Sequence, residues 1–265
     1  MLGGCIMLFR EGQPRFDDSG LINAATISSY ANTNEGNLKL PVRGIIIELP
    51  GLGGGSCLGG LMERADYATP YAKRFGEKGI LIAYLFPGPW SWGNRAAVRM
   101  ADAVVEAIAE KYSLDQVPVA VCGGSMGGQG ALMYAADSAH QLCGAAIACP
   151  CVDVEDRFDA HPSYPRTFVS AVAAYDMPLQ EALKAISPVC AASRMPDIPY
   201  WICSDGEDEV FPEAQCDQSV ETLQKQGHSV VYHRQPGLKH GGFIPEVREE
   251  LHLFLEKCIE QAADQ

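Results

Sequence analysis

Six short apolar runs recur along the chain and constrain its fold more than any other feature. Most of them are apolar at every position, so both faces of such a strand need cover. This pattern is typical of a parallel sheet enclosed between two layers of helices. The sixth run is more amphipathic than the others. The runs occupy residues 43–49, 79–86, 117–122, 143–149, 198–203 and 228–234.

Segments whose apolar residues recur with the spacing of an α-helix separate these runs, at residues 95–112, 126–137, 212–227 and 245–261. The repeated order of strand and helix predicts an α/β fold with right-handed crossovers. No linker or repeat interrupts it, so we expect a single domain over residues 1–265.

Two regions depart from the alternation. In residues 1–42, the stretches 5–12 and 22–31 are interpreted as two antiparallel edge strands. Residues 151–196 lie between two clear strands but contain no clear strand, only two helical stretches at 169–174 and 179–186. We expect this segment to be a cap inserted over one edge of the sheet.

Charge and cysteine usage exclude several classes of function. The chain has 33 acidic and 20 basic residues, a net charge of −13, which disfavours binding to nucleic acid or to anionic membranes.

No apolar stretch approaches the roughly 20 residues of a membrane span, and no signal peptide is evident, so a cytoplasmic location is expected. The ten cysteines contain no C-x-x-C pair and sit largely in apolar runs. They therefore predict buried reduced thiols and no metal site. A homo-oligomer is compatible with this composition.

Two glycine-rich loops each follow a predicted strand: "PGLGGGSCLGG" after Leu49, and "VCGGSMGGQG" from Val121. Neither loop has the G-x-G-x-x-G spacing of a dinucleotide site, and neither has the lysine of a phosphate-binding loop. The sequence therefore gives no support for a nucleotide cofactor.

The second loop contains Gly123-x-Ser125-x-Gly127 between a strand and a helix. This is the arrangement of a nucleophile elbow, in which a sharp turn exposes the serine hydroxyl and larger residues at the framing positions would collide with backbone. The alternative interpretation is a glycine turn that only allows close packing.

A nucleophilic serine needs a histidine base and an orienting acid, and in an α/β fold the acid precedes the histidine along the chain. Of six histidines, His240 alone lies in a glycine-flanked loop after the last strand. The acid is less defined, because Asp205, Glu207, Asp208 and Glu209 share one loop.

These segments resemble the α/β-hydrolase superfamily, and within it the branch of prolyl-oligopeptidase-type peptidases and related esterases. The similarity lies in "GGSMGGQGAL", in "ISPVCAASRMPDIPYWICSDGEDEVFP" and in "GLKHGGF", and extends from Arg43 to the end. It implies that Asp208 is the triad acid and His240 the base. Asp205 stays a second candidate because the family usually has glycine at that position.

The resemblance also implies an oxyanion hole made of two backbone amides. One comes from Met126, the residue after the nucleophile, and the other from Leu52, with Gly53 as the alternative. In the family this second amide lies in the loop after the third strand. In this sequence that loop starts with Pro50, where the family usually has histidine. Trp90 and Trp92, on the loop after residues 79–86, are expected to line the substrate pocket unless they serve only packing.

Together these features predict a serine hydrolase that needs no cofactor and cleaves small-molecule or carbohydrate-linked esters. A peptidase of the same fold is the first alternative, although such peptidases usually carry an N-terminal propeller for which 265 residues leave no room. An inactive binding protein is the second, and it is disfavoured because serine, acid and histidine occur in the required order.

Overall fold

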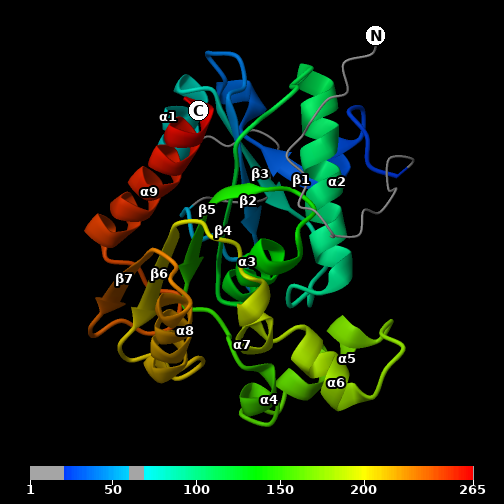
Figure 1. Ribbon diagram of the computed structural model, residues 1–265, viewed down its shortest axis with the longest axis vertical. Coiled ribbons are helices and arrows are strands. Elements are labelled where there is room, and N and C mark those ends of the chain that lie inside the picture. Colours follow the sequence, from blue (N-terminus) through cyan, green and yellow to red (C-terminus); the bar gives the residue numbers. More distant parts are fainter. Residues whose placement is uncertain (1–20, 60–68, 265) are drawn as a thin grey trace.

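A seven-stranded sheet forms the centre of the computed structural model, which describes residues 21–59 and 69–264 (Figure 1). All neighbouring strands run parallel except the first, which pairs antiparallel with β3 at one edge. The predicted α/β class with a mostly parallel sheet is therefore confirmed. In spatial order the strands are β1 (Ala31–Thr33), β3 (Ile80–Leu85), β2 (Gly44–Leu49), β4 (Val119–Gly124), β5 (Leu142–Ala148), β6 (Tyr200–Asp205) and β7 (Val230–Gln235).

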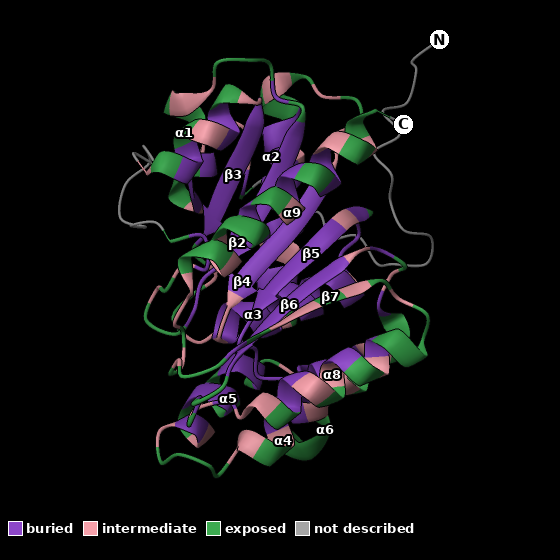
Figure 2. Ribbon diagram, turned by 90° about the vertical axis from the view of Figure 1, so that its left-hand side faces the viewer, coloured by how far each residue is buried: buried purple, intermediate pink, exposed green. Residues whose placement is uncertain are grey.

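The strands alternate side chains between two separate cores, although their sequences are apolar throughout. Ile45 and Ile47 of β2 face one core, while Ile46 faces the other. Both cores are closed by helices, so the strands other than β7 are buried almost end to end, whereas β7 at the edge is mostly half-buried or exposed (Figure 2). Helices α2 (Arg95–Tyr112), α3 (Met126–Asp137) and α8 (Glu213–Lys225) cover the first face, and α1 (Pro70–Glu77) and α9 (Pro245–Ala263) cover the second.

The N-terminal edge differs from the expectation of two strands. The expected strand at 5–12 lies outside the described residues. The stretch 22–31 forms turns and a short 3-10 helix, Ile27–Ser29, and strand β1 begins only at Ala31. The reason is local: the Ala25 amide donates to the Asn23 side chain at 3.0 Å, and the Asn23 amide donates to Thr26 at 3.1 Å. Such side-chain to backbone bonds favour turns over strand pairing.

Helix α1 is an element that the sequence analysis missed. Its start carries an N-terminal signal, because the Thr69 hydroxyl accepts from the Ala72 amide at 3.4 Å and proline occupies the first turn. The helix is eight residues long, which leaves little room for a clear period.

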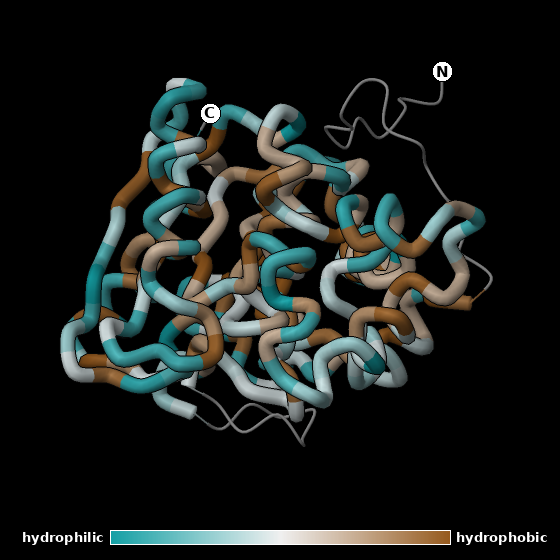
Figure 3. Tube along the Cα trace, turned by 90° about the horizontal axis from the view of Figure 1, so that it is seen from below, coloured by the Kyte–Doolittle hydropathy of each residue, from teal (hydrophilic) through white to brown (hydrophobic). Residues whose placement is uncertain are grey.

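Between β5 and β6 the chain forms four short helices at the carboxyl edge of the sheet, the lower side of Figure 1. In the view from below, hydrophobic and hydrophilic stretches alternate along the trace as a whole (Figure 3). Its apolar side chains, among them Phe168 and Leu183, form a third core that also includes Trp92 and Phe211. We call this segment, 151–196, the cap. Its helices are α4 (Val154–Arg157), α5 (Tyr164–Val172), α6 (Leu179–Ala185) and α7 (Pro188–Ala191).

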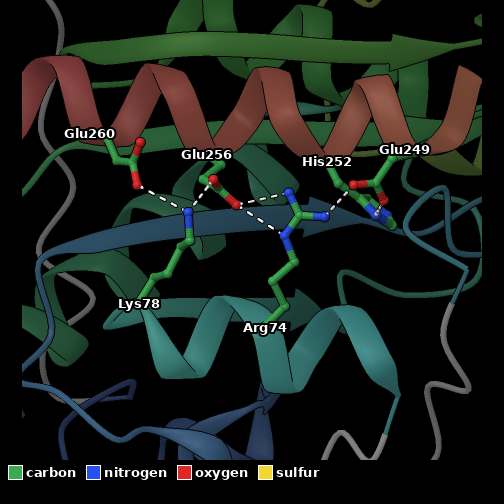
Figure 4. Close-up of polar contacts among 6 residues, drawn as sticks. All are labelled: Arg74, Lys78, Glu249, His252, Glu256 and Glu260. Carbon is green, nitrogen blue, oxygen red and sulfur yellow. Dashed lines mark hydrogen bonds and ion pairs between the residues drawn. The ribbon is translucent and has the colours of Figure 1, made fainter.

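A network of ion pairs joins α9 to α1 (Figure 4). The carboxylate of Glu256, only 9% exposed, contacts both Arg74, at 3.0 Å, and Lys78. Lys78 also reaches Glu260 at 3.3 Å, and Arg74 reaches Glu249. Water competes less well for the contacts of a shared, largely buried carboxylate than for those of an exposed one. This network therefore fixes how α9 lies on the sheet.

His252 extends the contacts of α9 to the loop after β2. Its Nε2 donates to the carbonyl oxygen of Leu58 at 3.1 Å, and its ring packs against Tyr71 and Phe75. Burial lowers the pKa of His252 below its ordinary value of 6.5, while the Leu58 carbonyl and Glu249 act in the opposite direction. The imidazole is therefore neutral in the folded protein at neutral pH.

We expect this histidine to make the fold sensitive to acid. Below pH 6.5 the unfolded chain binds a proton at His252 that the folded chain resists, so stability is lost as pH falls toward the lowered folded pKa. His252→Gln keeps a nitrogen donor for Leu58 but does not titrate. Urea unfolding at about pH 7.5 and about pH 5 should show a smaller loss for this variant than for the wild type. Equal losses would contradict the prediction.

Among the described residues, no helix is both long enough and apolar enough to cross a bilayer.

Candidate active site

Ser125 occupies the turn between β4 and α3, in a backbone conformation that non-glycine residues rarely adopt. Its φ is +58° and its ψ is −124°. The Ser125 amide donates to the carbonyl of Ala148 on β5 at 2.8 Å, and its own carbonyl accepts from the Gln129 amide at 3.1 Å. These bonds hold the strained turn, which is the geometry expected of a nucleophile elbow.

The two framing glycines are required by close backbone approach. A Cβ at Gly123 would lie 2.2 Å from the carbonyl oxygen of Gly127. A Cβ at Gly127 would lie 2.0 Å from the carbonyl oxygen of Leu49, at the end of β2. Close packing and the display of the serine are thus the same structural feature, and the two interpretations of the sequence are not exclusive.

Ser125, His240 and Asp208 form a continuous chain of hydrogen bonds. His240 Nε2 lies 2.8 Å from the Ser125 hydroxyl, and His240 Nδ1 lies 2.7 Å from Asp208 Oδ2. The serine follows β4, the aspartate β6 and the histidine β7, so the common carboxyl edge of parallel strands brings them together. The ring of Phe211 packs edge-on against the imidazole at 5.2 Å.

Asp208 is held as an acceptor for the histidine. Its side chain is 1% exposed, and its Oδ1 accepts from the amides of Val210 at 2.7 Å and Phe211 at 2.9 Å. Only Oδ2 is left to face the imidazole. Because a carboxylate can only accept, the arrangement puts the proton of His240 on Nδ1 and leaves Nε2 to accept from the serine.

Asp205, the second candidate for the acid, has other partners. Its Oδ2 accepts from the Gly241 amide at 2.8 Å, and its Oδ1 accepts from the Gln235 amide nitrogen at 2.8 Å. The Cys149 thiol also donates to it at 2.9 Å. Burial raises the pKa of Asp205. The structure thus brings Asp208, and not Asp205, to the imidazole; Glu207 and Glu209 are exposed.

The two residues whose amides are expected in the oxyanion hole lie near the serine, since Met126 directly follows it and Leu52 lines the same pocket. Met126 is the first residue of α3, and Leu52 lies in the loop after β2. Within residues 21–59 and 69–264, neither amide donates a hydrogen bond to another residue. Gly53, the alternative to Leu52, has a φ of +81°.

Glu48 organises this loop and was missed by the sequence analysis. It is fully buried at the end of β2, where its carboxylate accepts from the Leu58 amide at 3.3 Å and from the Ser56 hydroxyl. The Tyr84 hydroxyl adds a bond to the Gly54 carbonyl at 3.1 Å. The signal was present, since an acidic residue inside the apolar run "GIIIEL" needs buried partners.

A pocket of about 190 Å³ lies beside Ser125 and His240. Leu52 is at its wall and is 42% exposed. The other walls come from the loop after β2, the ends of β4 and β5, and the loop at residues 236–244 that carries His240, which we call the histidine loop. They are Gly51, Gly55, Ser56, Cys57, Gly124, Ala148, Cys149, Gly241 and Phe243.

The two tryptophans expected in the pocket are not among its walls. Trp92 is 1% exposed and packs on Phe168 at 4.4 Å in the core beneath the cap, which corrects the expectation of substrate contact. Trp90 is half-buried beside the same core, with Arg166 over its ring. The residues between β3 and α2 turn toward the cap, so packing accounts for both side chains.

In the part of the chain that the structure describes, two groups of three side chains have metal-binding atoms within 4.8 Å of one another, namely Glu48 with Cys57 and Cys122, and Cys149 with Asp205 and Asp208. In the second group both oxygens of each carboxylate accept hydrogen bonds from the protein.

A larger hollow, about 740 Å³, lies at the opposite edge of the sheet, by the amino ends of β4 and β5. Its walls include His140, Asp197 and Gln261, and none of the residues discussed above.

Comparison with known proteins agrees with this geometry. The sequence matches the prolyl oligopeptidase family over residues 83–264. The chain belongs to this family of serine hydrolases and has the α/β-hydrolase fold. It is 28% identical over 183 residues to dipeptidyl peptidase family member 6 of Caenorhabditis elegans, a match that covers 65% of this chain and 24% of that protein. The chain therefore spans about a quarter of that relative.

Solved structures share the fold at low sequence identity. Esterase B of Lactobacillus rhamnosis superposes with a TM-score of 0.63 at 12% identity, covering 86% of this chain and 79% of the other. A puromycin-hydrolyzing peptidase of Mycobacterium tuberculosis has a TM-score of 0.64 at 16% identity, covering 83% and 35%. The acylaminoacyl peptidase of Pyrococcus horikoshii has a TM-score of 0.60 at 17% identity, covering 83% and 38%.

The close approach at Gly127 predicts a sharp difference between two glycines of α3. Gly127→Ala places a methyl group against the fixed carbonyl of Leu49, so we expect a loss of roughly 2 kcal/mol or more in stability. In Gly130→Ala the nearest atom, 3.3 Å away, belongs to the flexible Leu49 side chain, so little loss is expected. Denaturant unfolding of both variants provides the measurement, and equal stabilities would contradict the close-approach argument.

Proposed function

We propose that this protein hydrolyses carboxylic esters through an acyl-enzyme formed on Ser125. The observation that carries the proposal is the unbroken hydrogen-bond chain from Ser125 through His240 to Asp208. His240 Nε2 takes the hydroxyl proton as the serine attacks the acyl carbonyl, and then delivers it to the leaving alcohol. Water repeats the sequence and releases the acid, while Asp208 keeps the imidazole in the required tautomer.

The amides of Met126 and Leu52 are proposed to stabilise the negative oxygen of the tetrahedral intermediate. Both flank Ser125, and neither donates a hydrogen bond within the described residues. The Met126 amide also lies at the amino end of α3, where the helix dipole favours negative charge. Backbone donors held in this way need no rearrangement when the charge develops.

Small uncharged acyl or alcohol groups fit the pocket beside the serine. Its walls carry Leu52, Ala148 and Phe243, and its volume is about 190 Å³; among the described residues that line it, His240 is the one ionisable nitrogen base. Similarity to esterase B over most of both chains is in keeping with an ester substrate.

Peptide cleavage is the second candidate, because the family match and the Caenorhabditis elegans relative both point to peptidases. The same triad attacks amides, but the leaving nitrogen must be protonated before it departs, which makes the step more demanding. Matched substrates separate the two functions: p-nitrophenyl esters and p-nitroanilides that carry the same short acyl or aminoacyl group. Because either class cleaves the activated ester faster, the anilide decides: we expect no anilide hydrolysis above the rate without enzyme, and anilide turnover that Ser125→Ala abolishes would favour the peptidase.

Substitutions of the proposed triad residues should lower turnover by different amounts. Ser125→Ala should lower kcat by at least about 10⁴-fold and prevent labelling by a fluorophosphonate probe. Asp208→Asn should lower kcat by roughly 10²–10⁴-fold, because the amide no longer fixes the imidazole tautomer. Glu207→Gln, which removes an exposed acid from the same loop, is the matched control and should behave as wild type.

Labelling of the Ser125→Ala variant, or normal turnover by it, would show that another residue is the nucleophile. A wild-type protein that neither labels nor hydrolyses any of these substrates would contradict the proposed function as a whole.

A further inference from the structure

We propose that Asp205 and Gln235 are positioning residues that hold His240 in place by binding the backbone of residues 241–244. This inference rests on the proposed function, since it assigns a role to the histidine loop. We call the pair the backbone clamp. Neither residue touches the imidazole, so both act on catalysis through the main chain.

The contacts of the backbone clamp are buried and specific. Asp205 is 1% exposed and Gln235 is fully buried. The Gln235 Nε2 donates to Asp205 Oδ1 at 2.8 Å, while its Oε1 accepts from the Ile244 amide at 2.9 Å. Asp205 Oδ2 accepts from the Gly241 amide at 2.8 Å. Two longer contacts of Gln235 Nε2 complete the set, to the carbonyl of Gly242 at 3.4 Å and to Cys203 Sγ at 3.6 Å.

Apart from the backbone clamp, the histidine loop is held to the loop after β6 by the Glu207 amide, which donates to the Leu238 carbonyl at 2.9 Å. Its residues from Pro236 to Gly242 are half-buried or exposed, and Gly241 has a φ of +78°. The His240 side chain itself is 21% exposed. Because misplacing a catalytic group by about 1 Å can cost about 100-fold in rate, backbone bonds next to the histidine bear directly on turnover.

Asp205 also joins three strand ends. It is the last residue of β6, Gln235 is the last residue of β7, and Cys149, which donates its thiol proton to Asp205, directly follows β5. Burying a carboxylate is costly unless donors surround it. Here the thiol, the Gly241 amide and the Gln235 amide supply them, and each fixes a different segment of the site.

The donor and acceptor pattern of the pair makes the clamp testable. A carboxylate only accepts, whereas the Gln235 amide must donate to Asp205 and accept from Ile244. In Asp205→Asn the new NH₂ group faces the NH₂ group of Gln235 when its oxygen keeps the Gly241 bond. In Gln235→Glu two carboxylates face each other. Combining the two substitutions exchanges donor and acceptor, preserves the net charge and restores the pairing.

We expect each single variant to lower kcat for an ester about 10- to 100-fold, with KM changed by less than about threefold. The double variant should recover to within a few-fold of wild type, because only the two long contacts of Gln235 Nε2, to the Gly242 carbonyl and to Cys203 Sγ, are lost. Glu207→Gln removes a charge from the same loop and serves as the unaffected control. Thermal denaturation of every variant verifies that it is folded at the assay temperature.

An NMR measurement tests the backbone clamp independently of the proposed function. The downfield proton resonance of the His240 Nδ1–H in its bond to Asp208 should broaden in each single variant and return in the double variant, whether or not a substrate is turned over. Single variants that are less stable but keep kcat and this resonance would show a purely structural role. A double variant no better than the poorer single variant would overturn the proposed pairing. An inactive, unlabelled wild type would instead contradict the proposed function.

Discussion

The contact between the turn at Ser125 and the end of β2 is the constraint on which the site depends. The Gly127 backbone lies so close to the Leu49 carbonyl that no side chain fits between them. This approach sets the start of α3, and with it Ser125, beside the loop after β2, whose Leu52 lines the same pocket. A turn that packed less tightly would not bring these two segments together.

Much of this arrangement follows from local sequence. The apolar runs and helical periods predict the strands and the four long helices because burial and chain period are encoded residue by residue. The order of Ser125, acid and His240 also follows from topology. The choice between Asp205 and Asp208 did not follow from local features, since both are acidic residues in one loop, and only the three-dimensional course of that loop shows which one meets the imidazole.

Elements whose stability comes from distant partners were harder to predict. Residues 22–31 have strand-like composition, but side-chain bonds around Asn23 and Thr26 turn the chain. Trp92 follows a strand at the catalytic edge, yet the core beneath the cap buries it. In each case a contact between residues far apart in sequence, or a local polar bond, outweighs the average preference of the segment.

Met126 links the cap to the reaction in a way that goes beyond the shape of the pocket. Its side chain is packed in the core beneath the cap with Phe168 and Phe211, while its amide flanks Ser125. A cap of different sequence therefore has to keep a space into which this methionine side chain packs. Because Met126 directly follows Ser125, a cap that changed this packing would also disturb the turn that carries the serine.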